Sequence, residues 1–180
     1  LNTGGGVTFS GGEPLLQADF ITEIAKLCKK DGISVGIQTA GNVPYEYFEK
    51  ILPYTDFIMC DMKIFNDVMH QKYVGTSNKL ILKNMERLSN ENIKLIIRTP
   101  VISRINENDI EDICKYIKDF ENLAYYELLK YHKLGLSKLE NLNINSCIEF
   151  EPPTDEKLKE LFFAAKKIIK NVKCIAIEEI

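Results

Sequence analysis

The sequence lacks closely spaced cysteines, and this absence excludes several classes of protein. It contains no Cys-x-x-Cys pattern, and its cysteines occur singly along 180 residues. A chain of this length can bury a core without disulfides, so we expect the thiols to be reduced and mostly buried. These cysteines are Cys28, Cys60, Cys114, Cys147 and Cys174.

The chain also lacks an excess of either charge and any long apolar run. Lys and Arg number 23 against 26 Asp and Glu, the two signs are interspersed, and the net charge is −3. Nucleic acids require a basic face, and a membrane-spanning helix requires about 20 apolar residues. No signal-peptide pattern opens the chain. We therefore expect one domain over residues 1–180, located in the cytoplasm, with neither nucleic acid nor membrane as a partner.

Short apolar runs alternate with amphipathic helical patterns throughout the chain. This rhythm is typical of βα units and a parallel sheet. Five or six strands are too few for a closed eight-stranded barrel, so the sequence predicts an α/β fold with a partial, open TIM-like barrel. The expected strands cover residues 7–10, 33–39, 56–63, 93–99 and 124–130, with an edge strand at 172–177. The expected helices cover residues 18–30, 45–52, 67–73, 80–90, 107–120 and 155–171.

The segment from Val7 to Leu16 predicts a strand that opens into a ligand site. Its sequence is Val-Thr-Phe-Ser-Gly-Gly-Glu-Pro-Leu-Leu. Gly11 and Gly12 allow backbone amides to approach a ligand, and the carboxylate of Glu13 suits a cationic group such as an amine. The alternative is a generic strand-to-helix turn.

Polar side chains also follow later apolar runs, at the strand ends where parallel sheets collect ligands. Asp61 and Lys63 lie two residues apart and therefore share a face of their strand, whereas Cys60 and Met62 take the other face. The acid and base can bind a zwitterion or a ribose, or they can form a salt bridge that caps a buried strand. Arg98 follows three apolar residues, where a guanidinium needs an anionic or polar partner. A structural ion pair across the barrel mouth is the alternative.

Three further residues have weaker individual signals. His132 follows the fifth strand, where a lone histidine is more often a structural or surface residue than a ligand-binding one. His70 lies on an amphipathic helix, and we expect it at the surface. Cys60 has no histidine near it in the sequence, so we expect a core residue and not a nucleophile.

Motifs at successive strands resemble those of radical S-adenosylmethionine (SAM) enzymes, specifically the activases of pyruvate formate-lyase and related glycyl radical enzymes. Asp61-Met62-Lys63 is similar to the family's Asp-Leu-Lys, and Arg98 to Ile102 is similar to its fifth-strand motif. The matching segments are residues 4–17, 37–42, 61–63, 98–102 and 127–135. The resemblance implies a six-unit open barrel of which this chain lacks the first βα unit.

The resemblance also implies which residues contact SAM. In the family the Gly-Gly-Glu-Pro segment contacts the methionine amino group, the lysine of the fourth strand meets the SAM carboxylate, and the arginine of the fifth strand helps to hold SAM. The acid beside that lysine lies near both SAM and the peptide substrate. The implied SAM-binding residues are Ser10, Gly11, Gly12, Glu13, Thr39, Asp61, Lys63, Arg98 and His132. Gln38 stands where the family has an acid, which leaves a weak monovalent cation site at Gln38, Thr39 and Asp61.

The chain departs from the family pattern most clearly at the cluster. Radical SAM enzymes carry a CxxxCxxC loop before the Gly-Gly-Glu-Pro segment, and its thiolates hold a four-iron four-sulfur cluster. That loop is absent here, so we expect no catalytic and no cluster-ligating residue in this chain. The first residue is Leu1, and we expect the C-terminal part of a longer polypeptide or a truncated reading frame. Smaller departures are Ser103-Arg104 in place of Pro-Gly and Lys130 in place of proline.

The implied function is that of a glycyl-radical-enzyme activase. The parent enzyme would cleave SAM reductively, with electrons from flavodoxin or ferredoxin, and abstract hydrogen from a glycine of the partner enzyme. The segment Thr39 to Pro44 leans toward the glycerol- or choline-lyase type. We expect this chain to be inactive alone. Two alternatives remain: a non-catalytic SAM- or partner-binding module, as a pseudoenzyme or separate subunit, and an unrelated barrel whose Gly-rich turn holds a phosphate. The second lacks a Gly-rich signature at its later strands.

Overall fold

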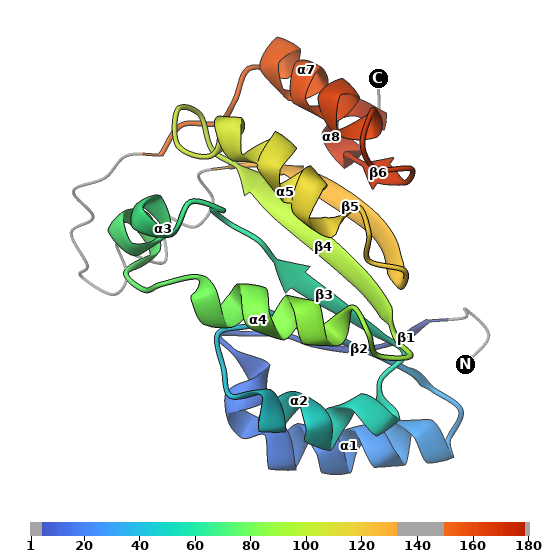
Figure 1. Ribbon diagram of the computed structural model, residues 1–180. Helices are drawn as coiled ribbons and strands as arrows, with labels where there is room; N and C mark the ends of the chain where they lie inside the picture. Colours follow the sequence, from blue (N-terminus) through green and yellow to red (C-terminus); the bar gives the residue numbers. More distant parts are fainter. Residues whose placement is uncertain (1–4, 133–149, 179–180) are drawn as a thin grey trace.

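The chain forms an open, curved sheet of six parallel strands that follow one another in chain order (Figure 1). The structure is a computed structural model, and it describes residues 5–132 and 150–178. Sequential parallel strands require crossovers, which the helices between them supply. The strands are β1 (Gly6–Phe9), β2 (Ser34–Thr39), β3 (Phe57–Asp61), β4 (Lys94–Val101), β5 (Leu123–Lys130) and β6 (Val172–Lys173). The predicted open α/β fold is confirmed.

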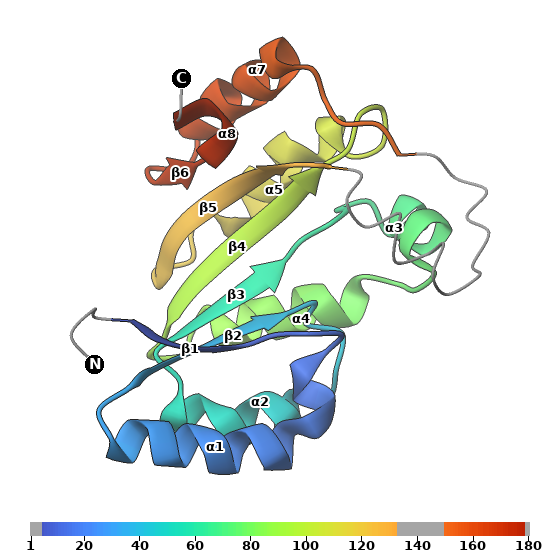
Figure 2. The same ribbon diagram turned by 180° about the vertical axis from the view of Figure 1, so that it is seen from behind.

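The described helices cover one face of this sheet and leave the other uncovered, as Figure 2 shows from behind. The helices between successive strands are α1 (Ala18–Lys30), α2 (Tyr45–Ile51), α3 (Asp67–Val74), α4 (Lys79–Leu88), α5 (Ile110–Ile117) and α7 (Asp155–Lys166). The other described elements are α8 (Ile175–Glu178) and the 3-10 turns η1 (Pro14–Gln17), η2 (Leu52–Tyr54) and η3 (Glu107–Asp109). We call the uncovered side the open face.

Side chains alternate between the two faces, and this alternation separates the core from the candidate site. On β4, Leu95, Ile97 and Val101 are 0% exposed in the core under the helices. Arg98 lies between them in sequence and points to the open face. On β3, Cys60 is likewise buried and Asp61 is only partly buried. The predicted parity of Cys60 and Asp61 is therefore confirmed.

The C-terminal elements differ from the sequence prediction. The last long helix ends at Lys166 and not near residue 171, and the edge strand is only Val172–Lys173 before α8 begins. The peptide carbonyl of Asn171 accepts a hydrogen bond from the Tyr126 amide at 2.9 Å, and its side chain donates to the Ala124 carbonyl at 2.7 Å. Asn171 thus attaches the chain to β5, and the pairing of β6 with β5 that follows extends over two residues only.

The expected surface position of His70 is wrong. The residue is 1% exposed, and its Nδ1 atom lies 2.7 Å from the Thr76 carbonyl oxygen. Helix α3 ends at Gly75, whose φ of 86° reverses the chain and brings that carbonyl back to the ring. The thiols behave as predicted where the structure describes them: Cys28, Cys60 and Cys114 are free and buried, and Cys174 is buried. Cys147 lies outside the described residues. No helix in the described part of the chain is long and apolar enough to cross a membrane.

Buried asparagine amides fix the loops that follow the strands. Asn84, on α4, is 1% exposed and donates to the carbonyls of Gly41 and Val43, both at 2.8 Å, in the loop after β2. Asn106, 0% exposed, donates to the carbonyls of Lys63 and Pro100, both at 2.7 Å. These carbonyls would otherwise be buried without a donor. The amides therefore hold the backbone beneath the candidate site.

We predict that Asn84→Ala lowers the free energy of unfolding by about 2 kcal/mol, because two buried carbonyls lose their donors. Urea denaturation monitored by circular dichroism measures the change. The matched control is Asn90→Ala, since the exposed Asn90 amide bonds only to the Glu86 carbonyl and to Ser89. That control should shift stability by less than about 0.5 kcal/mol. Equal losses in the two variants would contradict the role given to Asn84.

Candidate functional site

The carboxylate of Glu13 joins the loops that follow β1 and β2. Its Oε1 accepts from the Leu15 amide at 3.2 Å, and its Oε2 accepts from the Ala40 amide at 2.9 Å. The hydroxyl of Thr39 lies 2.8 and 2.9 Å from the two oxygens. A carboxylate has about four acceptor positions, and these three donors leave about one for a ligand cation.

The Thr39 hydroxyl also accepts a hydrogen bond from the Gly41 amide at 2.9 Å. Thr39 is 2% exposed, so its hydroxyl is buried between Glu13 and the turn at Gly41. Gly41 has a φ of 73°, in the left-handed region that favours glycine. Thr39 and Gly41 thus set the position of the Glu13 carboxylate.

The glycine loop before Glu13 leaves space for a ligand. Ser10, Gly11 and Gly12 are exposed, and a Cβ built on either glycine meets no atom within 4 Å. Gly11 has a φ of 129°, which an L side chain rarely adopts. The backbone of this loop is therefore accessible beside the remaining acceptor position of Glu13.

Asp61 and Arg98 form an ion pair between adjacent strands on the open face. They are direct partners in the β3–β4 register, and Oδ1 of Asp61 accepts from Nε at 3.1 Å and Nη2 at 2.7 Å of Arg98. The side chains are 20% and 13% exposed, respectively. The acid is thus paired with Arg98, and no ion pair among the described residues joins it to Lys63. The second oxygen of Asp61 accepts no hydrogen bond from a described residue, and so it can accept one from a ligand.

Cys60 lies beneath the surface, close to both Asp61 and Glu13. It is 0% exposed, which confirms its predicted core position. Burial raises the pKa of its thiol, and the negative charges of Asp61 and then Glu13 raise it further. Both carboxylates therefore lie close enough to act on one thiol, although β2 separates the two strands that they follow or end. A raised thiol pKa makes Cys60 a poor nucleophile at neutral pH.

Lys63 and His132 extend beyond the ends of β3 and β5. Lys63 is partly buried and lines a cavity of about 320 Å³ with Tyr73, Pro100 and Phe150. His132 is exposed directly after β5. Residues 133–135 of the motif that contains His132 lie outside the described residues.

A hydrogen-bonded chain behind β3 fixes the backbone that carries Lys63. The Tyr126 hydroxyl lies 2.9 Å from the Thr99 hydroxyl, which in turn donates to the Met62 carbonyl at 2.8 Å. Sequence reasoning missed Thr99 and Asn106, and it also missed Asn84. A detectable signal existed for Asn84, which interrupts the apolar stripe of α4 between Ile81 and Leu88.

The residues of the predicted cation site fall on both faces of the sheet. Gln38 is the register partner of Met59, so its side chain shares the open face with Asp61. The Thr39 side chain points the other way, toward Glu13 and Gly41. The monovalent cation site remains a prediction.

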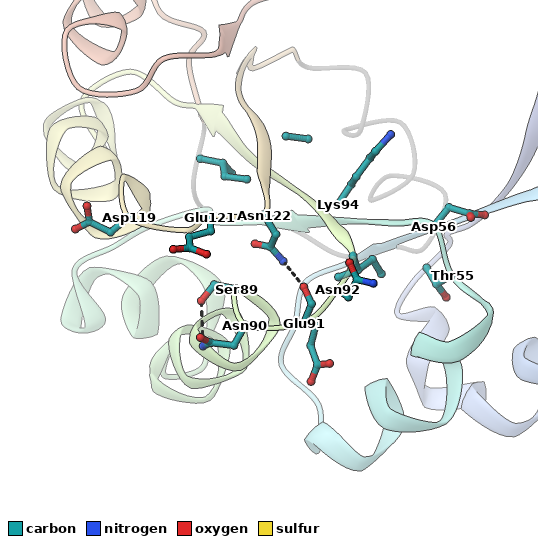
Figure 3. A pocket seen from close by; sticks show the side chains of 13 residues that line it. Thr55, Asp56, Ser89, Asn90, Glu91, Asn92, Lys94, Asp119, Glu121 and Asn122 are labelled. Atoms are coloured by element: carbon teal, nitrogen blue, oxygen red, sulfur yellow. Dashed lines mark hydrogen bonds between the residues drawn. The ribbon is translucent and has the colours of Figure 1, made fainter.

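A larger cavity of about 950 Å³ lies at the opposite ends of the strands (Figure 3). Thr55 and Asp56, just before β3, line it together with Lys94 and Asn122 at the starts of β4 and β5. None of the predicted site residues lines this cavity. Ligands of parallel sheets gather at the carboxyl ends of strands, so the candidate site is the one around Glu13 and Asp61.

The described residues fit SAM but not an iron–sulfur cluster. An acceptor at Glu13, a free oxygen on Asp61 and the cations of Arg98 and Lys63 match the ammonium, hydroxyl and carboxylate groups of SAM. Within residues 5–132 and 150–178, no group of three or more His, Cys, Asp or Glu side chains could hold a metal. The described cysteines are buried and dispersed through the core.

Comparison with known proteins identifies the family. The Radical SAM superfamily pattern matches residues 2–117. The chain is 35% identical over 171 residues to the pyruvate formate-lyase-activating enzyme of Clostridium pasteurianum, covering 93% of the chain and 71% of that protein. It is 36% identical over 156 residues to the (2S)-3-sulfopropanediol dehydratase activating enzyme of Klebsiella oxytoca, covering 79% of the chain and 49% of that protein.

A solved structure agrees in fold. The crystal structure of a domain of pyruvate-formate lyase-activating enzyme from Bacteroides vulgatus ATCC 8482 superposes with a TM-score of 0.79 at 24% identity, covering 94% of the chain and 98% of that structure. The chain spans about half to seven tenths of the length of the two curated relatives above. Matches of this extent show that the chain belongs to the radical SAM superfamily, among the activating enzymes of glycyl radical enzymes.

Proposed function

We propose that this chain supplies the SAM-binding and substrate-docking part of an activase that generates a glycyl radical on a partner enzyme. The observation that carries the proposal is the pair of carboxylates at the same edge of the sheet, beyond β1 and at the end of β3. Glu13 has about one acceptor position left, and Asp61 has one oxygen left. A single domain, a cytoplasmic location and an electron donor such as flavodoxin or ferredoxin belong to the same proposal.

Each polar group of SAM has a counterpart in this arrangement. The ammonium suits the Glu13 carboxylate, which Thr39 and Ala40 hold in place. The SAM carboxylate suits Lys63 and Arg98, and a ribose hydroxyl suits the free oxygen of Asp61 or the ring of His132. The backbone of Ser10, Gly11 and Gly12 lines the methionine moiety. SAM bound at a reduced cluster supplies a 5′-deoxyadenosyl radical in this family.

The protein residues bind and orient SAM, and the described residues provide no cluster ligands. In the complete activase a CxxxCxxC loop outside this chain would hold the four-iron four-sulfur cluster. The partner is a glycyl radical enzyme, of the pyruvate formate-lyase type or the glycerol- or choline-lyase type. Its glycine-bearing loop would enter from the open face, which none of the described helices covers (Figure 2).

We predict that Glu13→Gln weakens SAM binding about tenfold, because the charge-assisted bond to the ammonium is lost. Calorimetry with SAM and with 5′-methylthioadenosine, which lacks the amino acid moiety, isolates that contact. The parent chain should prefer SAM, and the variant should lose most of this preference. Glu23→Gln, an exposed substitution on α1, is the control. No SAM binding by the folded parent chain would contradict the proposed function.

We also predict that the purified chain shows no iron–sulfur absorbance after reconstitution with iron and sulfide. It should form no 5′-deoxyadenosine from SAM in the presence of dithionite. The reason is that the described cysteines are buried in the core and dispersed. Absorption spectroscopy and chromatography of the products measure both quantities. Turnover by the chain alone would refute the requirement for an outside cluster loop.

A second candidate function is a non-catalytic module that binds SAM or the partner enzyme. Two observations together favour it: the candidate site fits SAM, and no group of described residues fits an iron–sulfur cluster. A pull-down with a glycyl radical enzyme, performed beside the SAM calorimetry, distinguishes the two. Partner binding without SAM binding would favour the module.

A further inference from the structure

Four charged residues form a row across the open face of the sheet. Asp61 of β3 is the register partner of Arg98 of β4, Arg98 is the partner of Glu127 of β5, and Glu127 is the partner of Lys173 of β6. Register partners in a parallel sheet point to the same face. The row therefore alternates in sign over four neighbouring strands, with a formal sum of zero.

Three members of this row have partners among the described residues, and Glu127 has none there. Asp61 and Arg98 bond to each other, and the Lys173 ammonium lies 4.1 Å from the centroid of the Tyr125 ring. Glu127 is only 8% exposed, yet among the described residues it makes no hydrogen bond and no ion pair. A carboxylate that is so little exposed to water costs free energy unless hydrogen-bond donors reach it.

A ligand can reach this carboxylate from the open face. The described side-chain atoms that are both enclosed and unpaired lie elsewhere, on Thr22, Asn78 and Asn122. Tyr126 and Leu128, on either side of Glu127, point into the core at 0% and 1% exposed, so Glu127 points away from the helices. By strand alternation the Glu127 side chain is thus directed to the open face of the sheet.

The charges around Glu127 favour a ligand that offers an uncharged hydrogen-bond donor. Arg98 and Lys173 already balance the local carboxylates, so a further cation gains little and an anion meets Glu127 itself. The adjacent row on the same face is apolar, with Met59, Ile96 and Tyr125 in register. An extended peptide satisfies both conditions, because its N–H groups are neutral donors and its other atoms can lie on the apolar row. A glycine in such a peptide has no Cβ that would keep its N–H group from reaching the Glu127 carboxylate.

Glu127 lies level with Arg98 and Asp61, one and two strands away from them in the sheet. Neighbouring strands are about 4.8 Å apart, so Glu127 is about 10 Å to the side of Asp61. A second ligand can therefore occupy the open face over β5, beside SAM bound at β1 to β3.

We propose that Glu127 accepts main-chain N–H groups of the glycine-bearing peptide segment of the partner enzyme. This inference rests on the proposed function and adds a residue that contacts the peptide. Tyr125 and Ile96 support the same segment from the adjacent row.

The test measures peptide binding to the isotopically labelled chain by NMR shift titration in saturating SAM. The probes are acetyl-Ala-Ala-Gly-Ala-Ala-amide and the same peptide with N-methylglycine, which lacks the central N–H. Glu127→Gln should weaken binding of the first peptide about tenfold. It should have little effect on the second, because the bond in question is already missing. Glu121→Gln, exposed before β5, is the control, and the amide spectrum verifies that each variant is folded.

The outcomes separate this inference from the proposed function. SAM affinity should not change in Glu127→Gln, since the residue serves the peptide. A fall in SAM affinity with unchanged peptide affinity would assign Glu127 to the nucleoside and overturn the inference. A parent chain that binds SAM but neither peptide, or a Glu127→Gln variant that binds the first peptide normally, would also overturn it. Failure of the parent chain to bind SAM would instead refute the proposed function.

Discussion

The parallel pairing of consecutive strands is the constraint on which the candidate site depends. It brings the carboxyl ends of β1, β2 and β3 to one edge, where residues far apart in the sequence meet. Glu13 and Thr39 are 26 positions apart, yet one hydrogen bond joins them. Asp61 and Arg98 are 37 positions apart and meet as direct register partners. A shift of one residue in either pairing would move a side chain to the opposite face and separate these pairs.

Two layers of polar groups lie at this edge, an inner layer that supports the loops and an outer layer that is available to a ligand. The inner layer consists of Asn84, Thr99 and Asn106, which are almost fully buried and bond to backbone carbonyls. The outer layer consists of Glu13, Asp61 and Arg98, which are partly exposed and retain bonding capacity. Buried amides that are fully satisfied make the loops rigid. The outer groups are thereby held in position before a ligand arrives, which reduces the entropy lost on binding.

Local signals predicted much of the fold and of the candidate site. The bounds of α1 and the strand ends at Glu13 and Asp61 follow from periodicity and from glycine positions within a few residues. The sequence did not predict the burial of His70, because the helical periodicity of α3 does not show that the turn at Gly75 returns the Thr76 carbonyl to the ring. Lys173 and the charge row were also missed, since the register between β5 and β6 is set by contacts made some 46 residues apart. The sequence also left undecided whether Asp61 pairs with Arg98, because the register between β3 and β4 joins residues 37 positions apart.

The outer edge of β1 has a consequence for the behaviour of the chain in solution. Within the described residues β1 pairs only with β2, so one side of a Gly-Val-Thr-Phe strand presents its peptide groups to water. Exposed strand edges are templates on which another strand can add, including one from a second copy. Beside that edge, α1 and the preceding turn expose the large apolar side chains of Leu16, Phe20 and Leu27. At high concentration the chain is thus prone to self-association through the β1 edge and these apolar side chains. A segment or partner that covers them would raise the solubility of the chain.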